Sequence, residues 1–429
     1  MAWSNRSKEY EKLLEIGRPP NIAALFPNSK ALIVSGQFID RALMAKGQAM
    51  TIAANARSHL IIRGVLAAAQ KAKAGCIIEI AKSEGGHDFY CAVNYWNMAR
   101  QVDALLNEMG LTIPVAIHAD HYALKNSKDL EVAKVEVPSM FEAGITSIAI
   151  DASHQPDDQN LLSSVAINPY IPKWAGLECE VGEIKGDVGL STAEDALFLI
   201  QGLNAHDIHP DWIALNNGTT HGIQASSAGI QVELTSGIHQ ALKPYGVSGA
   251  QHGTSGNSTE RLKRIAKETR TTKANVATAL QMVLWGVKID DYGNAILDQN
   301  GSFTKIKGQG LSEELWAEME EYGAAKKFKA GDFKSLNLPF ENKILAQPKA
   351  IRDRMVEGVE AFVYHLLTEV FSANDTAPLA YEAILQAGSY APAQKARRLE
   401  DPAEWTEAKI LEKAKSLTTD KGPRGNYDD

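Results

Sequence analysis

The stretch Pro114-Val115-Ala116-Ile117-His118, followed directly by Ala119-Asp120-His121, carries the pattern from which the fold can be predicted. An apolar run of strand length ends here in side chains that can bind metals or move protons. A short run that is apolar on both faces is typical of a parallel strand covered by helices on either side. Eight successive runs of this kind end in polar residues between about residues 50 and 280. These polar residues are Asn55, Ser83, Asp120 with His121, Asp151, Glu178 with Glu180, His221, His252 and Asn275.

Longer amphipathic stretches separate the runs, so strands and helices should alternate along this part of the chain. Such alternation is typical of an α/β protein with a parallel sheet. A (βα)8 barrel gathers the ends of all its strands on one face, whereas an open sheet would keep eight strand ends apart. We therefore predict a TIM barrel over residues 31–300, beginning at the run Ala31-Leu32-Ile33-Val34. One of its helices should open at Ser191-Thr192-Ala193-Glu194, which has a capping-box pattern.

Helical patterns flank the predicted barrel on both sides. We expect a helical N-terminal segment over residues 1–30 and a helical C-terminal extension over residues 301–429. Pro348 and Pro378 fit as helix starts in the extension, because proline is tolerated in the first turn of a helix. The extension should pack on the barrel or on a partner subunit, and we expect a homo-oligomer.

The composition is that of a globular protein with a large core. Of the 429 residues, 45% are hydrophobic and 22% are charged, which excludes a disordered or collagen-like chain. With 44 Lys and Arg against 52 Asp and Glu, the net charge of −8 argues against nucleic-acid binding. Three widely spaced cysteines favour neither a disulfide framework nor a paired-cysteine metal site. Without a signal-peptide core or an apolar stretch of about 18 residues, we expect a cytoplasmic protein with no membrane partner.

Three of the strand-end residues are histidines, namely His121, His221 and His252. Neutral imidazole is a common zinc ligand, and Glu180 could add a fourth. Glu178 and Glu180 should point to the same side of their strand, where two acids are costly unless they meet a cation. Any one of these histidines alone could be an ordinary core or surface residue. Their shared position at strand ends is what predicts a metal site.

Glycine-rich loops accompany two of these histidines. The chain reads Asn217-Gly218-Thr219-Thr220-His221-Gly222 and, later, His252-Gly253-Thr254-Ser255-Gly256. Glycine lets backbone N–H groups approach an anion, and barrels often bind phosphate at the loops after their last two strands. Each loop also fits an ordinary turn, so phosphate binding and plain turn chemistry both stay open.

The ordered set of motifs resembles the class II, metal-dependent fructose-bisphosphate and tagatose-bisphosphate aldolases over about residues 55–278. The segments that carry the resemblance are His118-Ala119-Asp120-His121, Ile150-Asp151-Ala152-Ser153, Leu177-Glu178-Cys179-Glu180-Val181-Gly182, Gly218-Thr219-Thr220-His221-Gly222, His252-Gly253-Thr254-Ser255 and Lys273-Ala274-Asn275-Val276-Ala277-Thr278. It implies a TIM barrel, zinc or another divalent ion, and reversible aldol cleavage of a phosphorylated ketose to dihydroxyacetone phosphate and an aldehyde.

The resemblance also assigns roles to individual residues. Asp120 would be the catalytic acid/base that moves the proton of the hydroxyl on carbon 4. The metal ligands would be His121, His221, His252 and Glu180. A second divalent or monovalent cation would lie at Asp151 and Glu178. The phosphate and the ketose would be held by Gly222, Gly253, Ser255, Asn275 and Thr278, and also by Asn55 and Ser83.

The chemistry agrees with these roles. Aldol cleavage leaves negative charge on an enediolate, and a metal ion stabilises that charge as a Lewis acid by several kcal/mol. Asp120 is adjacent in sequence to a proposed ligand and could accept the hydroxyl proton. Successive strand residues face opposite ways, so we expect Asp120 or His121 to lie on the turn out of the strand. His118, three residues before His121, should buttress it.

The chain departs from the family pattern at three places. The loop after the fifth strand lacks a Glu-Glu pair, for which Glu183 and Asp187 are the candidate substitutes. Ala279 stands where an acidic residue commonly follows the last motif. We place no arginine for a second phosphate, since Arg352 and Arg354 fall on a tail helix and are expected to be surface charges. Two alternatives therefore stay open: another metal-dependent sugar-phosphate enzyme of this fold, such as an epimerase or hydrolase, and a non-catalytic aldolase-like subunit.

Overall fold

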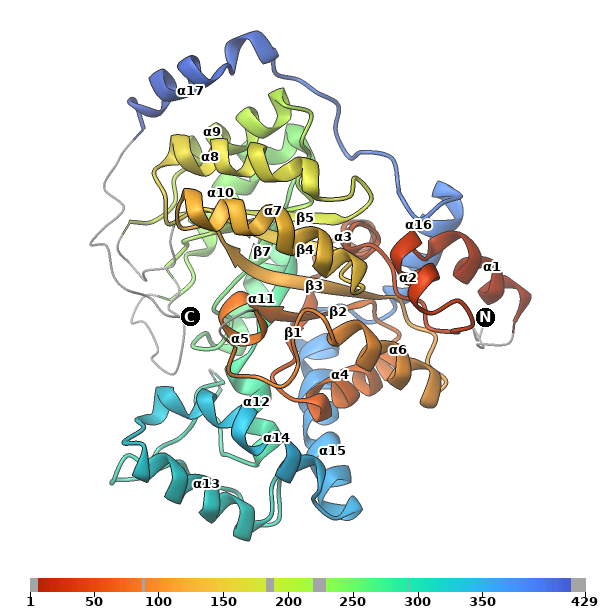
Figure 1. The fold of residues 1–429 in the computed structure, drawn as a ribbon, viewed down its shortest axis with the longest axis vertical. Coiled ribbons are helices and arrows are strands. Elements are labelled where there is room, and N and C mark those ends of the chain that lie inside the picture. Colours follow the sequence, from red (N-terminus) through yellow and green to blue (C-terminus); the bar gives the residue numbers. More distant parts are fainter. Residues whose placement is uncertain (1–6, 87–88, 183–188, 219–228, 292, 418–429) are drawn as a thin grey trace.

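Eight parallel strands in chain order form a closed barrel, and the first strand pairs with the last. The computed structural model describes residues 7–86, 89–182, 189–218, 229–291 and 293–417. The strands are β1 (Thr51–Asn55), β2 (Cys76–Ala81), β3 (Val115–Ala123), β4 (Ser147–Asp151), β5 (Gly176–Val181), β6 (Trp212–Leu215), β7 (Ser248–Gln251) and β8 (Thr271–Val276). This architecture confirms the predicted TIM barrel (Figure 1).

Helices follow the strands around the barrel. They are α4 (His59–Ala72), α5 (Lys82–Gly85), α6 (Met98–Glu108), α7 (Ser127–Glu142), α8 (Asp157–Ile167), α9 (Ala193–Ala205), α10 (Val232–Leu242), α11 (Thr259–Glu268) and α12 (Thr278–Trp285), with short 3-10 turns at Asn168–Tyr170 and Lys243–Tyr245. The capping box of α9 is formed by Thr192 and Asp195, one residue later than predicted. Ser191 instead donates its hydroxyl to the carbonyl of Val181, at the end of β5.

The run at residues 31–34 is not a barrel strand, which corrects the predicted start of the barrel. Ile33 makes an isolated parallel bridge to Val115, and the chain then enters α3 (Gly36–Lys46). Helix α3 contacts β2, β3, β5 and β8, so it lies across the N-terminal end of the barrel. The run is apolar because it is buried under this end. Before it come α1 (Lys8–Gly17) and α2 (Pro20–Leu25), so the N-terminal segment is helical where it is described.

The C-terminal extension consists of helices spread over different sides of the barrel (Figure 1). They are α13 (Glu313–Ala325), the 3-10 segment η3 (Ala330–Leu336), α14 (Asn337–Leu345), α15 (Lys349–His365), the π-helical segment η4 (Leu366–Val370), α16 (Ala377–Ala387), η5 (Pro402–Glu404) and α17 (Glu407–Ala414). Pro348 caps α15 and Pro378 lies in the first turn of α16, which agrees with the prediction that both begin helices.

The extension packs as part of the barrel's own core. Helix α15 packs on α4 and α12, α16 packs on α1 and α3, and α17 packs on α8. Residues 388–401, which we call the C-terminal strap, run between α16 and α17 along one side of the molecule (Figure 1). Among the described residues, no helix combines the length and the apolar character needed to cross a membrane.

Candidate active site

A cavity of about 700 Å³ opens at the carboxyl ends of the strands. It brings together predicted residues from five different strands or the loops that follow them. The predicted residues that line it are Asn55, Ser83, Asp120, His121, His252, Gly253, Ser255, Asn275 and Thr278. His221, Gly222, Glu183 and Asp187 lie outside the described residues. Asp151, Glu178 and Glu180 are described but are not among the lining residues, and they group with His121 and His252 instead.

Asp120 and His121 both reach the site because β3 carries a bulge. Both residues lie within β3, and the pairing of β3 with β4 shifts in register between Ala119 and Tyr122. His121 adopts a positive φ of 43°, a region that residues other than glycine rarely occupy. The bulge turns both side chains toward one point. The expectation that one of them lies on the turn out of the strand is thus replaced by an irregularity inside the strand.

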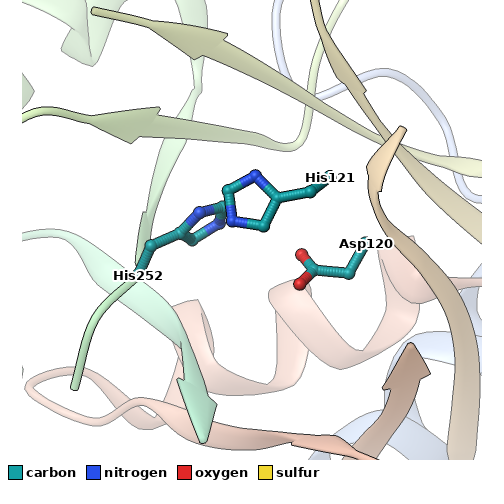
Figure 2. Close-up of side chains that lie close together, drawn as sticks. All are labelled: Asp120, His121 and His252. Atoms are coloured by element: carbon teal, nitrogen blue, oxygen red, sulfur yellow. The ribbon is translucent and has the colours of Figure 1, made fainter. Parts of the chain in front are cut away.

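Two imidazoles and one carboxylate converge at this point (Figure 2). The rings of His121 and His252 lie edge to face with centroids 4.2 Å apart, and the Asp120 carboxylate points toward them. One possible ligand atom from each of these three residues lies within 4.8 Å of the others. All three side chains are buried. The two imidazoles fit a divalent cation such as zinc, and the Asp120 carboxylate lies close enough to act beside such an ion.

Glu180 and Glu178 point to the same side of β5, as predicted, but at different depths. Glu180 Oε1 lies 3.0 Å from His121 Nδ1, and Glu180 Oε2 lies 3.8 Å from His252 Nδ1. Glu178 comes two residues earlier on the strand and therefore lies roughly 6.6 Å deeper. There its Oε1 is 2.7 Å from His252 Nε2. Glu180 thus contacts both imidazoles from nearer the carboxyl end of β5, and Glu178 contacts His252 from two residues earlier on the strand.

This difference in depth separates the pair expected to hold a second cation. Asp151 groups with His121 and Glu180, whose possible ligand atoms lie within 4.8 Å of one another. Glu178 groups with Glu180 and His252 instead. Asp151 also accepts a hydrogen bond from the hydroxyl of Ser153 at 2.6 Å. The geometry therefore pairs Asp151 with Glu180 rather than with Glu178.

Burial and neighbouring charges together shift the pKa of several of these groups. Burial and the nearby Asp151 raise the pKa of Glu180 to about 8, against the opposing effect of His121. Burial alone would raise the pKa of Asp120, but His121 and Lys273 lower it below its ordinary value. Burial would lower the pKa of His121, but Glu180 and Asp120 raise it well above its ordinary value. Metal binding would compete with these protons, because the ligating imidazole must be neutral and the carboxylate ionised.

Lys273 and Glu79 belong to the site and were not predicted as functional residues. Lys273 Nζ lies 2.9 Å from Glu178 Oε2, 3.1 Å from Glu79 Oε2 and 3.5 Å from Asp120 Oδ1. Both new side chains are fully buried. The available signal was a charged residue inside each of two apolar runs, at residues 76–81 and 273–277.

His118 contacts a serine of β4 and an acid of β5. Its Nδ1 lies 2.7 Å from Ser147 Oγ, and its Nε2 lies 3.5 Å from Glu178 Oε2. It is buried one level deeper in the barrel, and burial lowers its pKa well below the ordinary value. His118 thus packs beside Glu178, and its expected role as a buttress for His121 stays a prediction.

The remaining predicted binding residues form the walls of the cavity. The Asn55 amide donates to Glu84 Oε2 at 2.6 Å, and the Asn275 amide donates to Asp120 Oδ1 at 2.9 Å. Gly253 has a positive φ of 59°, so a side chain at this position would be strained. Ser255 lies between Gly253 and the start of α11, which Ser258 caps. Backbone N–H groups at such a helix start favour an anion.

The C-terminal extension contributes one wall of the same cavity. Lys329, Asp332 and Lys334 of the extension line it, and Leu297 lines it from just before the extension. Lys334 Nζ lies 5.4 Å from the centre of the Tyr90 ring. Arg352 and Arg354 are not among the lining residues of the described cavity.

Both arginines instead hold loops of the extension together. The Arg352 guanidinium donates to the carbonyl of Leu345 at 2.9 Å. The Arg354 guanidinium donates to the carbonyls of Gly310 and Leu311 at 2.7 and 2.8 Å. They are half-buried structural residues rather than the surface charges that we expected.

Comparisons with known proteins agree with the geometry. A family model, "Fructose-bisphosphate aldolase class-II", matches residues 38–327. Fructose-bisphosphate aldolase of Staphylococcus aureus strain Mu50 is 30% identical over 125 residues, which are 29% of this chain and 39% of that enzyme. The 6-phospho-5-dehydro-2-deoxy-D-gluconate aldolase of Bacillus velezensis is 26% identical over 282 residues, which are 62% of this chain and 87% of that enzyme.

The fold is shared with a solved aldolase structure as well. Fructose-bisphosphate aldolase from Campylobacter jejuni matches with a TM-score of 0.52 at 17% identity, over 81% of this chain and 97% of that chain. A likeness at this identity concerns the fold alone. The family match covers more than half of the chain and includes every described strand of the barrel. The chain belongs to the class II fructose-bisphosphate aldolase family, a family of carbon–carbon lyases.

Proposed function

We propose that this protein catalyses the reversible, metal-dependent aldol cleavage of a phosphorylated ketose, similar to fructose 1,6-bisphosphate, to dihydroxyacetone phosphate and an aldehyde. The observation that carries the proposal is the convergence of Asp120, His121 and His252 in one buried cluster that lines the cavity. His221 and Glu180 are proposed to complete the metal ligands. A bound divalent ion, zinc in our proposal, would supply Lewis-acid stabilisation of the enediolate.

Asp120 is proposed as the acid/base. Its carboxylate accepts a hydrogen bond from the Asn275 amide and lies near the Lys273 ammonium. Because the pKa of this carboxyl is lowered, the group is ionised at neutral pH. An ionised carboxylate can accept the proton of the carbon-4 hydroxyl as the bond between carbons 3 and 4 breaks. The electron pair of that bond stays with the dihydroxyacetone phosphate fragment as an enediolate, which takes up a proton on its carbon to give the product, and Glu183 and Asp187 are the proposed donors of that proton. In the direction of condensation, Asp120 returns the proton to the new hydroxyl.

Gly253 and Ser255 are proposed to bind the phosphate of dihydroxyacetone phosphate, together with Gly222. Gly253 and Ser255 line the cavity just before the α11 start, and Asn55, Ser83 and Thr278 line it too. Fixing the phosphate would hold the reacting carbons at a set distance from Asp120.

The far end of the substrate is proposed to carry a second anionic group. Lys329 and Lys334 line the wall that the extension contributes. A phosphate or carboxylate on the aldehyde part of the ketose would meet these ammonium groups. In this proposal, Lys334 of η3 and Lys329, the residue before η3, take the place of the arginine that the sequence did not supply. A homo-oligomer, a cytoplasmic location and a second cation at Asp151 and Glu178 remain predictions.

A cleavage assay over ketose mono- and bisphosphates tests the proposal. Activity should be lost on EDTA treatment and return with zinc or cobalt, and His252→Ala should lose both metal and activity. An intact metal site with no carbon–carbon cleavage on any ketose phosphate would favour an epimerase or hydrolase. A protein that neither binds metal nor cleaves would favour the non-catalytic subunit.

Asp120→Asn separates acid/base chemistry from metal binding. We expect kcat to fall by about 10²–10⁴-fold, because an amide cannot accept the hydroxyl proton. Zinc content, measured by mass spectrometry of the purified protein, should stay within about twofold of the wild type if the histidines and Glu180 supply the main ligands. The control is Asp353→Asn on the exposed face of α15, where the carboxylate pairs with Lys349. Unchanged kcat in Asp120→Asn would overturn the role of Asp120.

A further inference from the structure

Lys273 is a fully buried cation at the floor of the candidate site. It projects from β8 into the barrel, where its Nζ lies within 3.5 Å of oxygens of Glu178, Glu79 and Asp120. These three acids come from β5, β2 and β3, so the ammonium links strands on different sides of the barrel. One cation among three acids makes an electrostatically linked layer beneath the metal-ligand candidates.

The layer is not what packing alone would select. Barrel interiors are filled mainly by branched apolar side chains. Removing a charge from water has a penalty of several kcal/mol per ion, and well-packed apolar residues of similar volume are often as stable as a buried ion pair. Stability by itself therefore does not explain Lys273 and its acids. Their contacts with the residues above them offer a functional explanation.

Two of the three acids, Asp120 and Glu178, connect Lys273 with residues that have a proposed function. Asp120 is the proposed acid/base, and its Oδ1 lies 3.5 Å from the ammonium and 2.9 Å from the Asn275 amide. Glu178 contacts Lys273 through Oε2, while its Oε1 lies 2.7 Å from His252 Nε2. With Nε2 directed at Glu178, His252 Nδ1 faces Glu180 at 3.8 Å. Glu79, the third acid, contacts the same ammonium and serves as a natural comparison.

We propose that Lys273 is a positioning residue that holds Asp120 directly, and His252 through Glu178, in the geometry needed for metal binding and proton transfer. The inference rests on the proposed function. Carboxylates that hold the far nitrogen of a metal-binding histidine commonly tune metal affinity by about 10–100-fold. Glu178 is such a carboxylate for His252, and Lys273 holds Glu178 in place, so Lys273 acts on the histidine through one further residue.

Three variants of the full-length protein test this role: Lys273→Gln, Glu79→Gln and the double variant Glu79→Gln with Lys273→Gln. The double variant removes the ammonium together with one of the acids that it contacts, so one fewer acid is left buried without a cation than in Lys273→Gln. Zinc affinity is measured by competition with a chromophoric chelator. Visible absorption of the cobalt-loaded protein at saturating cobalt reports the ligand geometry.

We expect zinc to bind about 10–100-fold more weakly to Lys273→Gln and to the double variant, with an altered cobalt spectrum in both. Glu79→Gln should stay within about threefold of the wild type with an unchanged spectrum, because its loss leaves Lys273 in contact with Glu178 and Asp120. Wild-type affinity in the double variant would overturn the inference, and so would equal weakening in Glu79→Gln and Lys273→Gln. Failure of the wild type itself to bind zinc or cobalt would instead overturn the proposed function.

Discussion

His239 is a buried histidine whose environment keeps it neutral. It lies in α10 with its ring against Gly249 of β7, and the backbone N–H of Arg270 donates to its Nδ1 at 3.2 Å. Burial and the charge of Arg270 lower its pKa to about 3. In the unfolded chain, the pKa returns to about 6.5. The unfolded state therefore binds more protons than the folded state between these two values.

Stability should for this reason fall as the pH is lowered from about 6.5 toward 3, by up to about 1.4 kcal/mol per pH unit from this group. His239→Asn keeps an acceptor for the Arg270 N–H but cannot take up the proton. We expect it to be less stable at pH 7 and to show a shallower loss of stability between pH 7 and 5. Urea unfolding at three pH values measures both slopes. His206→Asn, at an exposed histidine, is the matched control, and equal slopes in wild type and His239→Asn would refute the argument.

Helix α15 joins the barrel through a close contact with α4 at Gly64. A Cβ atom built on Gly64 would lie 2.7 Å from Val359 Cβ and 3.0 Å from the carbonyl oxygen of Val356. Atoms do not approach so closely without movement, so glycine lets the two helices meet. The extension thus depends on a small residue inside a barrel helix. Gly237 in α10 offers a contrast, because no atom of the described residues outside its own helical turn lies within 4 Å of a Cβ placed there.

The two glycines should respond in opposite directions to the same substitution. We expect Gly64→Ala to lower the free energy of unfolding by about 1–3 kcal/mol, since it forces α15 away from α4. Gly237→Ala should raise it by about 0.5–1 kcal/mol, because alanine loses less backbone entropy than glycine in a helix. Thermal and urea unfolding of both variants measure the signs. Destabilisation by Gly237→Ala, or none by Gly64→Ala, would contradict the packing described here.

The C-terminal strap fastens the end of the chain to the N-terminal face of the barrel. Lys395 in the strap forms an ion pair with Asp40 of α3, and its ammonium donates to the carbonyl of Asp211 at 2.9 Å. Asp40 also accepts from the hydroxyl of Thr272 at 2.6 Å. Burial raises the pKa of Asp211 to about 6, although Lys395 opposes the shift. One side chain of the extension thus neutralises two acids beneath the barrel.

Loss of this ammonium should weaken the whole fold. Lys395→Met leaves Asp40 and Asp211 buried without their cation, so we expect unfolding free energy to fall by about 3–5 kcal/mol at pH 7.5. The pKa of Asp211 should rise further, so the folded state takes up a proton and the deficit shrinks as the pH falls toward 5. Lys409→Met breaks an exposed pair with Glu404 and should change little. A deficit that is independent of pH, or equal in both variants, would count against the role of Lys395.

Much of the fold could be predicted because its cause is local. Buried parallel strands need apolar residues on both faces, and the runs at residues 51–55, 76–81 and 147–151 show this directly. The run at residues 31–34 has the same composition but becomes a buried lead into α3, since burial under the barrel also selects apolar residues. Strand-end polarity similarly indicated Asp120, His121 and His252, because strand direction alone decides which end of the barrel they face.

Side-chain depth and pairing depended on barrel closure. Lys273 and Asp120 are 153 residues apart in the chain, and sequence spacing cannot tell which of several interior acids a lysine will meet. The bulge at His121 and the pairing of Asp151 with Glu180 follow from the register between neighbouring strands. The lysines of the extension lie at the cavity beside contacts between distant segments: the Asn337 amide donates to Gln281 of α12, and the backbone N–H of Leu338 donates to the carbonyl of Tyr90. Local composition thus decides which residues are strands and which end carries chemistry, whereas contacts between distant segments decide which side chains meet.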